Sequence, residues 1–148
     1  MNFKKIIKYL LITLPWFLSS IIFKIDTNYY KTLNLPIFAP PSYLFPIVWI
    51  ILFILIGISI YQTISKSNST YKIYLTINYL ANQFFTLCFF TIKNNFLSFA
   101  DCLIVLISSM YLYIETKDIN KNAAKYLIPY IIWNIYATIL SFSILCLN

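Results

Sequence analysis

Long apolar stretches separated by short polar segments make up most of the chain. Five such stretches cover about residues 6–23, 46–63, 73–92, 96–114 and 123–147. A helix crosses the hydrocarbon core of a bilayer with roughly 20 mostly apolar residues. The pattern therefore predicts an all-α integral membrane protein, in which a bundle of five transmembrane helices forms a single domain over residues 1–148.

The first apolar stretch follows Lys4, Lys5 and Lys8, an arrangement that secretory signal peptides share. No pair of small residues typical of a cleavage site follows the stretch. We therefore expect an uncleaved first span, with the lysines reaching back to the membrane surface at its start.

The longest polar connection is residues 24–45, which we call loop 1. Pro36, Pro40 and Pro41 fix the backbone and lack an amide donor, so they predict a stiff, extended segment. Pro46 is compatible with a first helical turn, whose amides have no partner within the helix, and the second span is expected to begin there.

Composition supports a membrane protein and excludes several kinds of site. The chain is 61% hydrophobic and 10% charged, which is too apolar for a water-soluble protein of 148 residues. A single glycine excludes glycine-rich phosphate loops and dinucleotide fingerprints. Histidine is absent, and Cys88, Cys102 and Cys146 have irregular spacing within apolar stretches. We therefore expect no metal site and no disulfide framework, and interpret the cysteines as core residues.

The net charge of +7 comes from eleven lysines, which lie mostly between the apolar stretches. This placement indicates membrane orientation and not a nucleic-acid partner. Five spans would put three lysines on one side and the other eight on the opposite side: Lys4, Lys5, Lys8, Lys66, Lys72, Lys117, Lys121 and Lys125. Lysine-rich segments of membrane proteins stay on the cytoplasmic side. This rule predicts a cytoplasmic N-terminus, with loop 1 and the C-terminus outside, in a bacterial plasma membrane.

Short motifs along the last four spans carry a resemblance to a known family. They are Pro36-Ile37-Phe38-Ala39-Pro40-Pro41, Leu44-Phe45-Pro46-Ile47-Val48-Trp49, Ile56-Gly57, Asn82, Phe89-Phe90, Lys93-Asn94, Asp101, Pro129-Tyr130-Ile131-Ile132-Trp133, Ala137-Thr138 and Leu140. In order and spacing the chain resembles the TspO/MBR family, the tryptophan-rich sensory proteins also called translocator proteins or peripheral-type benzodiazepine receptors.

The chain also departs from the pattern of that family. Phe38 and Phe85 stand where the family usually has tryptophan, Asn78 where it often has glutamine, and Ser141 where it commonly has asparagine. The sterol-contact motif of animal members needs a basic residue near the C-terminus, and none follows Phe142. We therefore do not expect sterol recognition through that motif.

The resemblance implies a membrane receptor or sensor that binds tetrapyrroles, such as protoporphyrin IX or haem precursors, in a cavity within the bundle. It implies no required cofactor and a homodimer. Two alternatives stay open, a light- and oxygen-dependent enzyme that degrades porphyrins and a transporter of porphyrins or other lipophilic molecules. The residues expected to contact the ligand are Phe38, Pro40, Pro41, Trp49, Asn78, Asn82, Phe85, Trp133, Ala137 and Leu140.

Trp49 and Trp133 are the residues most closely tied to this function, since they match the tryptophans that line the pocket of the family. A flat macrocycle stacks on indole faces, and an oxidisable indole is the reactant that the enzyme alternative requires. The competing interpretation is that tryptophans in a membrane span are interfacial anchors or core packing.

Several polar and proline residues also have two interpretations. Asn78 and Asn82 lie one turn apart, and either bind ligand carboxylates or form hydrogen bonds between helices. Pro40 and Pro41 hold loop 1 either as a lid over the cavity or as a rigid turn. We expect a structural role for Asp101, with Lys93 and nearby polar groups as its partners.

Overall fold

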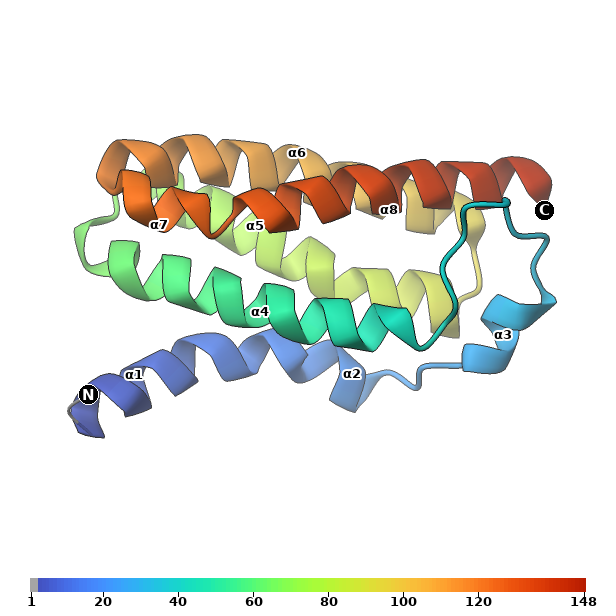
Figure 1. Ribbon diagram of the computed structural model, residues 1–148, viewed down its shortest axis with the longest axis horizontal. Helices are drawn as coiled ribbons and strands as arrows, with labels where there is room; N and C mark the ends of the chain where they lie inside the picture. The colour runs from blue at the N-terminus through green and yellow to red at the C-terminus, as the bar shows by residue number, and fades with distance from the viewer. Residues whose placement is uncertain (1–2) are drawn as a thin grey trace.

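The computed structural model describes residues 3–148, apart from the side chain of Thr27, and those residues fold into helices joined by short connections. Figure 1 shows the long helices running side by side, with the two ends of the chain at opposite ends of the bundle. The helices are α1 (Phe3–Thr13), α2 (Leu18–Ile22), α3 (Thr27–Thr32), α4 (Leu44–Thr63), α5 (Ser69–Thr86), α6 (Asn95–Ile119), α7 (Lys121–Lys125) and α8 (Ile128–Leu147).

Polar side chains cap the N-termini of several of these helices by accepting hydrogen bonds from free backbone amides. The carboxylate of Asp26 caps α3. The side-chain amide oxygens of Asn68, Asn94 and Asn120 cap α5, α6 and α7. The sequence prediction placed the starts of the third and fourth spans at residues 73 and 96. These caps explain why the helices begin earlier, at Ser69 and Asn95.

Two segments interrupt regular α-helix. A 3-10 turn, η1 (Leu14–Phe17), separates α1 from α2 at Pro15, which cannot supply an amide donor. A π-helical segment, η3 (Leu87–Thr91), follows α5. Lys93 then adopts a left-handed conformation with φ of 58°, in the short turn that reverses the chain into α6.

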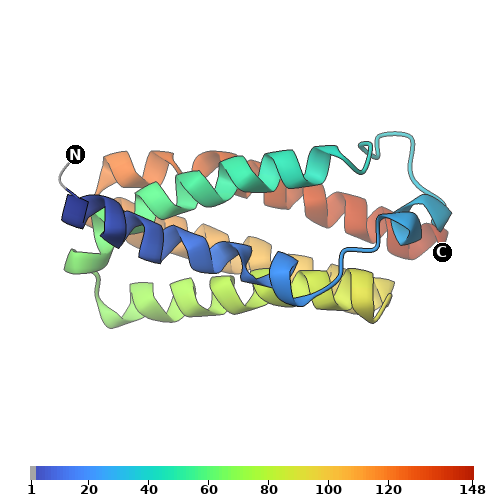
Figure 2. The same cartoon turned by 90° about the horizontal axis from the view of Figure 1, so that it is seen from below.

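The packing has a core of four helices and one additional layer. The α6 helix packs along both α5 and α8, and α4 contacts α6, α7 and α8. The α1–η1–α2 segment packs on α4 and α5, and Figure 2 shows it lying between them. Trp16 anchors this segment, since its side chain is buried against Phe53 and Tyr79 with ring centroids 5.9 and 5.3 Å apart.

The only glycine of the chain lies where α1 approaches α4. A Cβ atom added to Gly57 would collide with Oγ1 of Thr13 and would lie 3.1 Å from its Cβ. Gly57 therefore allows a helix contact that is closer than any other residue type permits.

The outward faces of the helices are apolar, as expected for a protein surrounded by lipid. Large hydrophobic side chains such as Ile51, Ile104 and Ile132 are exposed there. Four segments are long and apolar enough to cross a bilayer, namely Phe3–Ile22, Leu44–Lys66, Asn95–Ile119 and Lys121–Leu147. The protein is therefore a multi-pass integral membrane protein.

Loop 1 is less extended than its prolines suggest. The α3 helix forms within it, because Asp26 accepts hydrogen bonds from the amides of Asn28 and Tyr29. The prolines act only on the second half of the loop, where Pro36 accepts a hydrogen bond from the amide of Ala39. Figure 1 shows this half passing close to the C-terminal end of α8.

Candidate functional site

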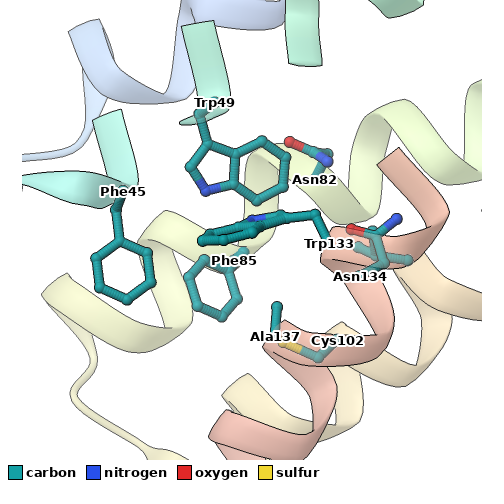
Figure 3. Close-up of a pocket in the computed structure, with 9 residues that line it drawn as sticks. Phe45, Trp49, Asn82, Phe85, Cys102, Trp133, Asn134 and Ala137 are labelled. Atoms are coloured by element: carbon teal, nitrogen blue, oxygen red, sulfur yellow. The ribbon is translucent and has the colours of Figure 1, made fainter. Parts of the chain in front are cut away.

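A small cavity lies between α4, α5, α6 and α8. Its volume is about 40 Å³, which is enough for one or two water molecules. Figure 3 shows the side chains around it. The lining residues are Phe45, Trp49, Asn82, Phe85, Cys102, Val105, Trp133, Asn134 and Ala137.

Four of the nine lining residues are aromatic. Figure 3 shows the Trp133 ring between the rings of Trp49 and Phe85. Phe45 packs edge-on against Trp133, with ring centroids 6.1 Å apart at 73°. Both indoles are only partly buried, so each ring keeps free surface. Such a wall favours flat, apolar, conjugated ligands over polar ones.

A buried hydrogen-bond network lies directly beside the cavity and joins three helices. Asn78 donates to the Val105 carbonyl at 3.1 Å and to Oγ of Ser108 at 2.9 Å. The Tyr130 hydroxyl donates to Oδ1 of Asn78 at 3.0 Å and accepts from Nδ2 of Asn82 at 2.8 Å. The network therefore uses both asparagines for bonding between helices, which is one of the two predicted roles.

Three buried polar atoms near the cavity have no hydrogen-bond partner among the described residues. They are Nε1 of Trp133, Nδ2 of Asn134 and Oδ2 of Asp101. Trp133 and Asn134 line the cavity, whereas Asp101 precedes Cys102, which also lines it. Native structures rarely leave such atoms unpaired, so these groups indicate a place where a ligand or water supplies partners.

The structure brings together half of the residues expected to contact the ligand. Trp49, Asn82, Phe85, Trp133 and Ala137 line the cavity. The other expected contacts lie elsewhere: Asn78 in the network, Leu140 in a second buried cluster, and Phe38, Pro40 and Pro41 in loop 1.

Sequence reasoning missed Phe45, Cys102, Val105 and Asn134 as lining residues. Phe45 precedes Trp49 by one helical turn and so shares its face, a signal that helical spacing supplies. No comparable signal marks Cys102 and Asn134. Their position depends on how α6 and α8 pack, which local sequence does not determine.

Loop 1 is fastened to the middle of α8. The Tyr136 hydroxyl donates to the carbonyl of Phe38 at 3.0 Å, and their rings meet edge to face. Within the loop, the Tyr30 hydroxyl donates to the carbonyl of Pro40 at 3.0 Å. Burial raises the pKa of Tyr30 to about 12, so this hydroxyl keeps its proton at all physiological pH values.

A second fastening joins loop 1 to the turn between η3 and α6. Lys93 forms an ion pair with Asp26, with Nζ and Oδ2 3.0 Å apart, and its ammonium also lies over the Tyr29 ring. The hydrogen bond from Lys93, followed by that from the Tyr29 amide, holds the pKa of Asp26 below its ordinary value. Lys93 therefore pairs with Asp26, and not with Asp101 as the sequence analysis expected.

Metal binding finds no support in this region. Within residues 3–148, no group of three or more His, Cys, Asp and Glu side chains is arranged to hold a metal ion. The arrangement instead suits noncovalent binding of an apolar ring system between α4, α5 and α8.

The fold and the cavity define a class: an all-helical, multi-pass membrane protein with a tryptophan-lined cavity inside its bundle. The model of the TspO/MBR family matches residues 9–147, and the chain belongs to this family. The resemblance inferred from the motifs is confirmed.

Curated relatives support the same assignment. The tryptophan-rich protein TspO of Bacillus cereus is 35% identical over 136 residues, covering 90% of this chain and 89% of the relative. The membrane protein YtaB of Bacillus subtilis is 37% identical over 131 residues, covering 86% and 84%. The tryptophan-rich protein TspO of Chlorobaculum tepidum is 30% identical over 125 residues, covering 81% and 79%.

Proposed function

We propose that this protein is a membrane receptor that binds tetrapyrroles, such as protoporphyrin IX or haem precursors, in the cavity between α4, α5, α6 and α8. The observation that carries the proposal is the wall on which Trp49, Trp133 and Phe85 lie together. A conjugated macrocycle gains about 0.5–1.5 kcal/mol from each good aromatic contact beyond the burial of its surface.

Binding at this site requires the cavity to open. Its volume of about 40 Å³ is far below the roughly 300–1,000 Å³ of pockets that hold drug-sized ligands. Phe45 lies in the first turn of α4, directly after loop 1, so a movement of loop 1 would carry this part of the wall with it. We therefore propose that loop 1 acts as a lid, which Pro40 and Pro41 stiffen.

Porphyrin titration of the purified protein in nanodiscs tests the proposal, with porphyrin absorbance as the signal. We expect saturable binding, and dissociation constants that rise about two- to tenfold in Trp49→Phe and in Trp133→Phe. Trp16→Phe is the matched control, because Trp16 lies in the core outside the cavity. An absence of saturable binding to the wild-type protein contradicts the proposal.

A second candidate function is light- and oxygen-dependent degradation of the bound porphyrin. It is favoured by the presence of two indoles in one cavity, where either can give an electron to an excited porphyrin. Illumination of the complex in air then bleaches the porphyrin, and the bleaching slows in Trp49→Phe and in Trp133→Phe and stops in the double variant. If the porphyrin absorbance survives illumination in the wild-type complex, the protein is a receptor only.

The finer membrane topology is part of the same proposal. We propose that α5 with η3 is a fifth span, since it packs along α6 although its asparagines lower its hydropathy. Eight lysines at the end that holds the N-terminus, against three at the other, support a cytoplasmic N-terminus in a bacterial plasma membrane. Self-association into a homodimer is proposed from the family alone, and cross-linking in native membranes tests it.

A further inference from the structure

The cavity carries no positive charge. None of its nine lining residues is basic, and all eleven lysines of the chain are exposed. A carboxylate inside this cavity would therefore lose its water without gaining a counter-ion, which is strongly unfavourable. The part of a ligand that enters the cavity must be uncharged.

Asn134 supplies the polar feature that such a ligand must match. Only 2% of its surface is exposed, and its Nδ2 has no hydrogen-bond partner among the described residues. Its polar neighbour is the Tyr130 hydroxyl, one turn earlier in α8, which already donates to Asn78 and accepts from Asn82. No hydrogen bond holds the Asn134 amide, so rotation about χ2 can present its N–H to the cavity.

Asp101 adds a reason for an uncharged partner. Its side chain is buried next to Cys102, and its Oδ2 has no donor among residues 3–148. A ligand carboxylate placed near Cys102 would meet no cation, because every lysine of the chain is exposed. A carbonyl oxygen loses less hydration than a carboxylate on burial and still accepts a hydrogen bond.

We propose that Asn134 is a specificity-determining residue that donates its amide N–H to an uncharged carbonyl oxygen on the buried edge of the bound ligand. The cavity then prefers conjugated ring systems with a neutral oxygen on that edge over those with a carboxylate there or with no oxygen. This inference rests on the proposed tetrapyrrole binding.

Three porphyrins test the inference in nanodiscs: protoporphyrin IX dimethyl ester with neutral carbonyls, protoporphyrin IX with carboxylates, and octaethylporphyrin without oxygen. In the wild-type protein the dimethyl ester should bind about three- to tenfold more tightly than octaethylporphyrin, as one buried hydrogen bond implies. The free acid should bind more weakly than the ester. In Asn134→Leu, the ester and octaethylporphyrin should bind with dissociation constants within about twofold.

Two further measurements separate specificity from a structural role. Phe45→Leu changes the same wall without changing any hydrogen bond, so it should raise the dissociation constants of all three porphyrins by a similar factor. Asn134→Leu should leave the thermal unfolding midpoint unchanged or raise it, because the amide has no partner to lose. If Asn134→Leu lowers the unfolding midpoint and weakens the binding of all three porphyrins equally, the inference is overturned.

The outcomes also distinguish this inference from the proposed function. If no porphyrin binds the wild-type protein, tetrapyrrole binding itself is wrong. If all three bind and the ratio of ester to octaethylporphyrin is the same in wild type and in Asn134→Leu, only the role of Asn134 is wrong.

Discussion

The Asn78 amide is fully buried, and its hydrogen bonds reach Val105, Ser108 and Tyr130. The Asn134 amide is almost equally buried, and its Nδ2 has no partner. The two residues have the same chemistry and lie beside the same cavity. What separates them is whether a neighbouring helix offers a complementary group, so Asn78 contributes to stability whereas Asn134 is available for recognition.

Replacement of Asn78 by leucine should therefore destabilise the bundle. It removes the acceptor of the Tyr130 hydroxyl and leaves this buried O–H without an acceptor, at a cost of about 1–3 kcal/mol in the free energy of unfolding. Unfolding in mixed detergent micelles measures the change. Asn122→Leu is the control, because Asn122 is exposed, and an equal loss in both variants would contradict the role of the network.

At the scale of elements, close helix contact and the fastening of loop 1 both depend on single residues. Gly57 lets α1 approach α4 at Thr13, and this contact joins the first span to the bundle. Lys93 and Asp26 join α3 to the turn before α6. Asn34 and Asn148 exchange hydrogen bonds that fasten loop 1 to the end of α8.

The variant Gly57→Ala should weaken the contact between α1 and α4. Its new Cβ collides with Thr13, and overpacking of this kind costs about 1–3 kcal/mol, more than the helix propensity that alanine gains. The midpoint of detergent-induced unfolding should fall. Truncation of the opposing side chain in Thr13→Ala/Gly57→Ala should restore most of the loss, and additive losses in the double variant would argue against a direct clash.

The ion pair between Asp26 and Lys93 should respond only to acid. The pKa of Asp26 is lowered in the folded protein, so its stabilising effect is complete above the ordinary value of about 4 and is lost as the pH falls through the lower folded value. Amide chemical shifts of α3 should therefore stay constant from neutral pH down to about pH 5 and move below it.

Asp26→Asn provides the control for this titration. It should remove the acid transition in the α3 amide shifts, while Asp118→Asn should leave the transition in place. Both partners are partly exposed, so high salt should reduce the effect of the pair. A transition that persists in Asp26→Asn would assign it to another carboxylate.

For the whole molecule, the central question is how the helices cross the membrane. Four segments qualify by length and hydropathy, and α5 does not, because polar residues throughout the helix, among them Lys72, Asn78, Asn82 and Gln83, lower its hydropathy. Both asparagines are buried and bonded to Tyr130, so they do not face lipid. A span can therefore be polar on its inner face without a cost in the bilayer.

Single cysteines in a cysteine-free background should report this topology. With five spans, Ser65→Cys and Lys117→Cys should react with a membrane-impermeant thiol reagent from the cytoplasmic side, and Ile92→Cys from the opposite side. Ser65 follows the end of α4, Ile92 follows η3, and Lys117 lies in the last turn of α6. All three residues are exposed, so the reagent can reach them. Labelling of Ser65→Cys and Ile92→Cys from the same side would mean that α5 does not cross.

Much of the fold was predictable because the hydropathy of a membrane span is a local property. Four of the five predicted spans match segments that are long and apolar enough to cross a bilayer, and Pro46 lies in the first turn of α4 as expected. The resemblance also led to five residues that line the cavity. Hydropathy did not predict α3, which depends on the side-chain cap of Asp26 and not on apolar periodicity.

The sequence by itself determined that the protein lies in a lipid bilayer, that it is all-helical and that it belongs to the TspO/MBR family. These properties follow from apolar runs and motifs that need no knowledge of distant contacts. Only the tertiary structure decided which polar group meets which. It paired Lys93 with Asp26, joined Asn78 and Asn82 to Tyr130, and left Nδ2 of Asn134 unpaired at the cavity. Such pairings depend on how α5, α6 and α8 are rotated against one another, because a hydrogen bond forms only within about 3.5 Å.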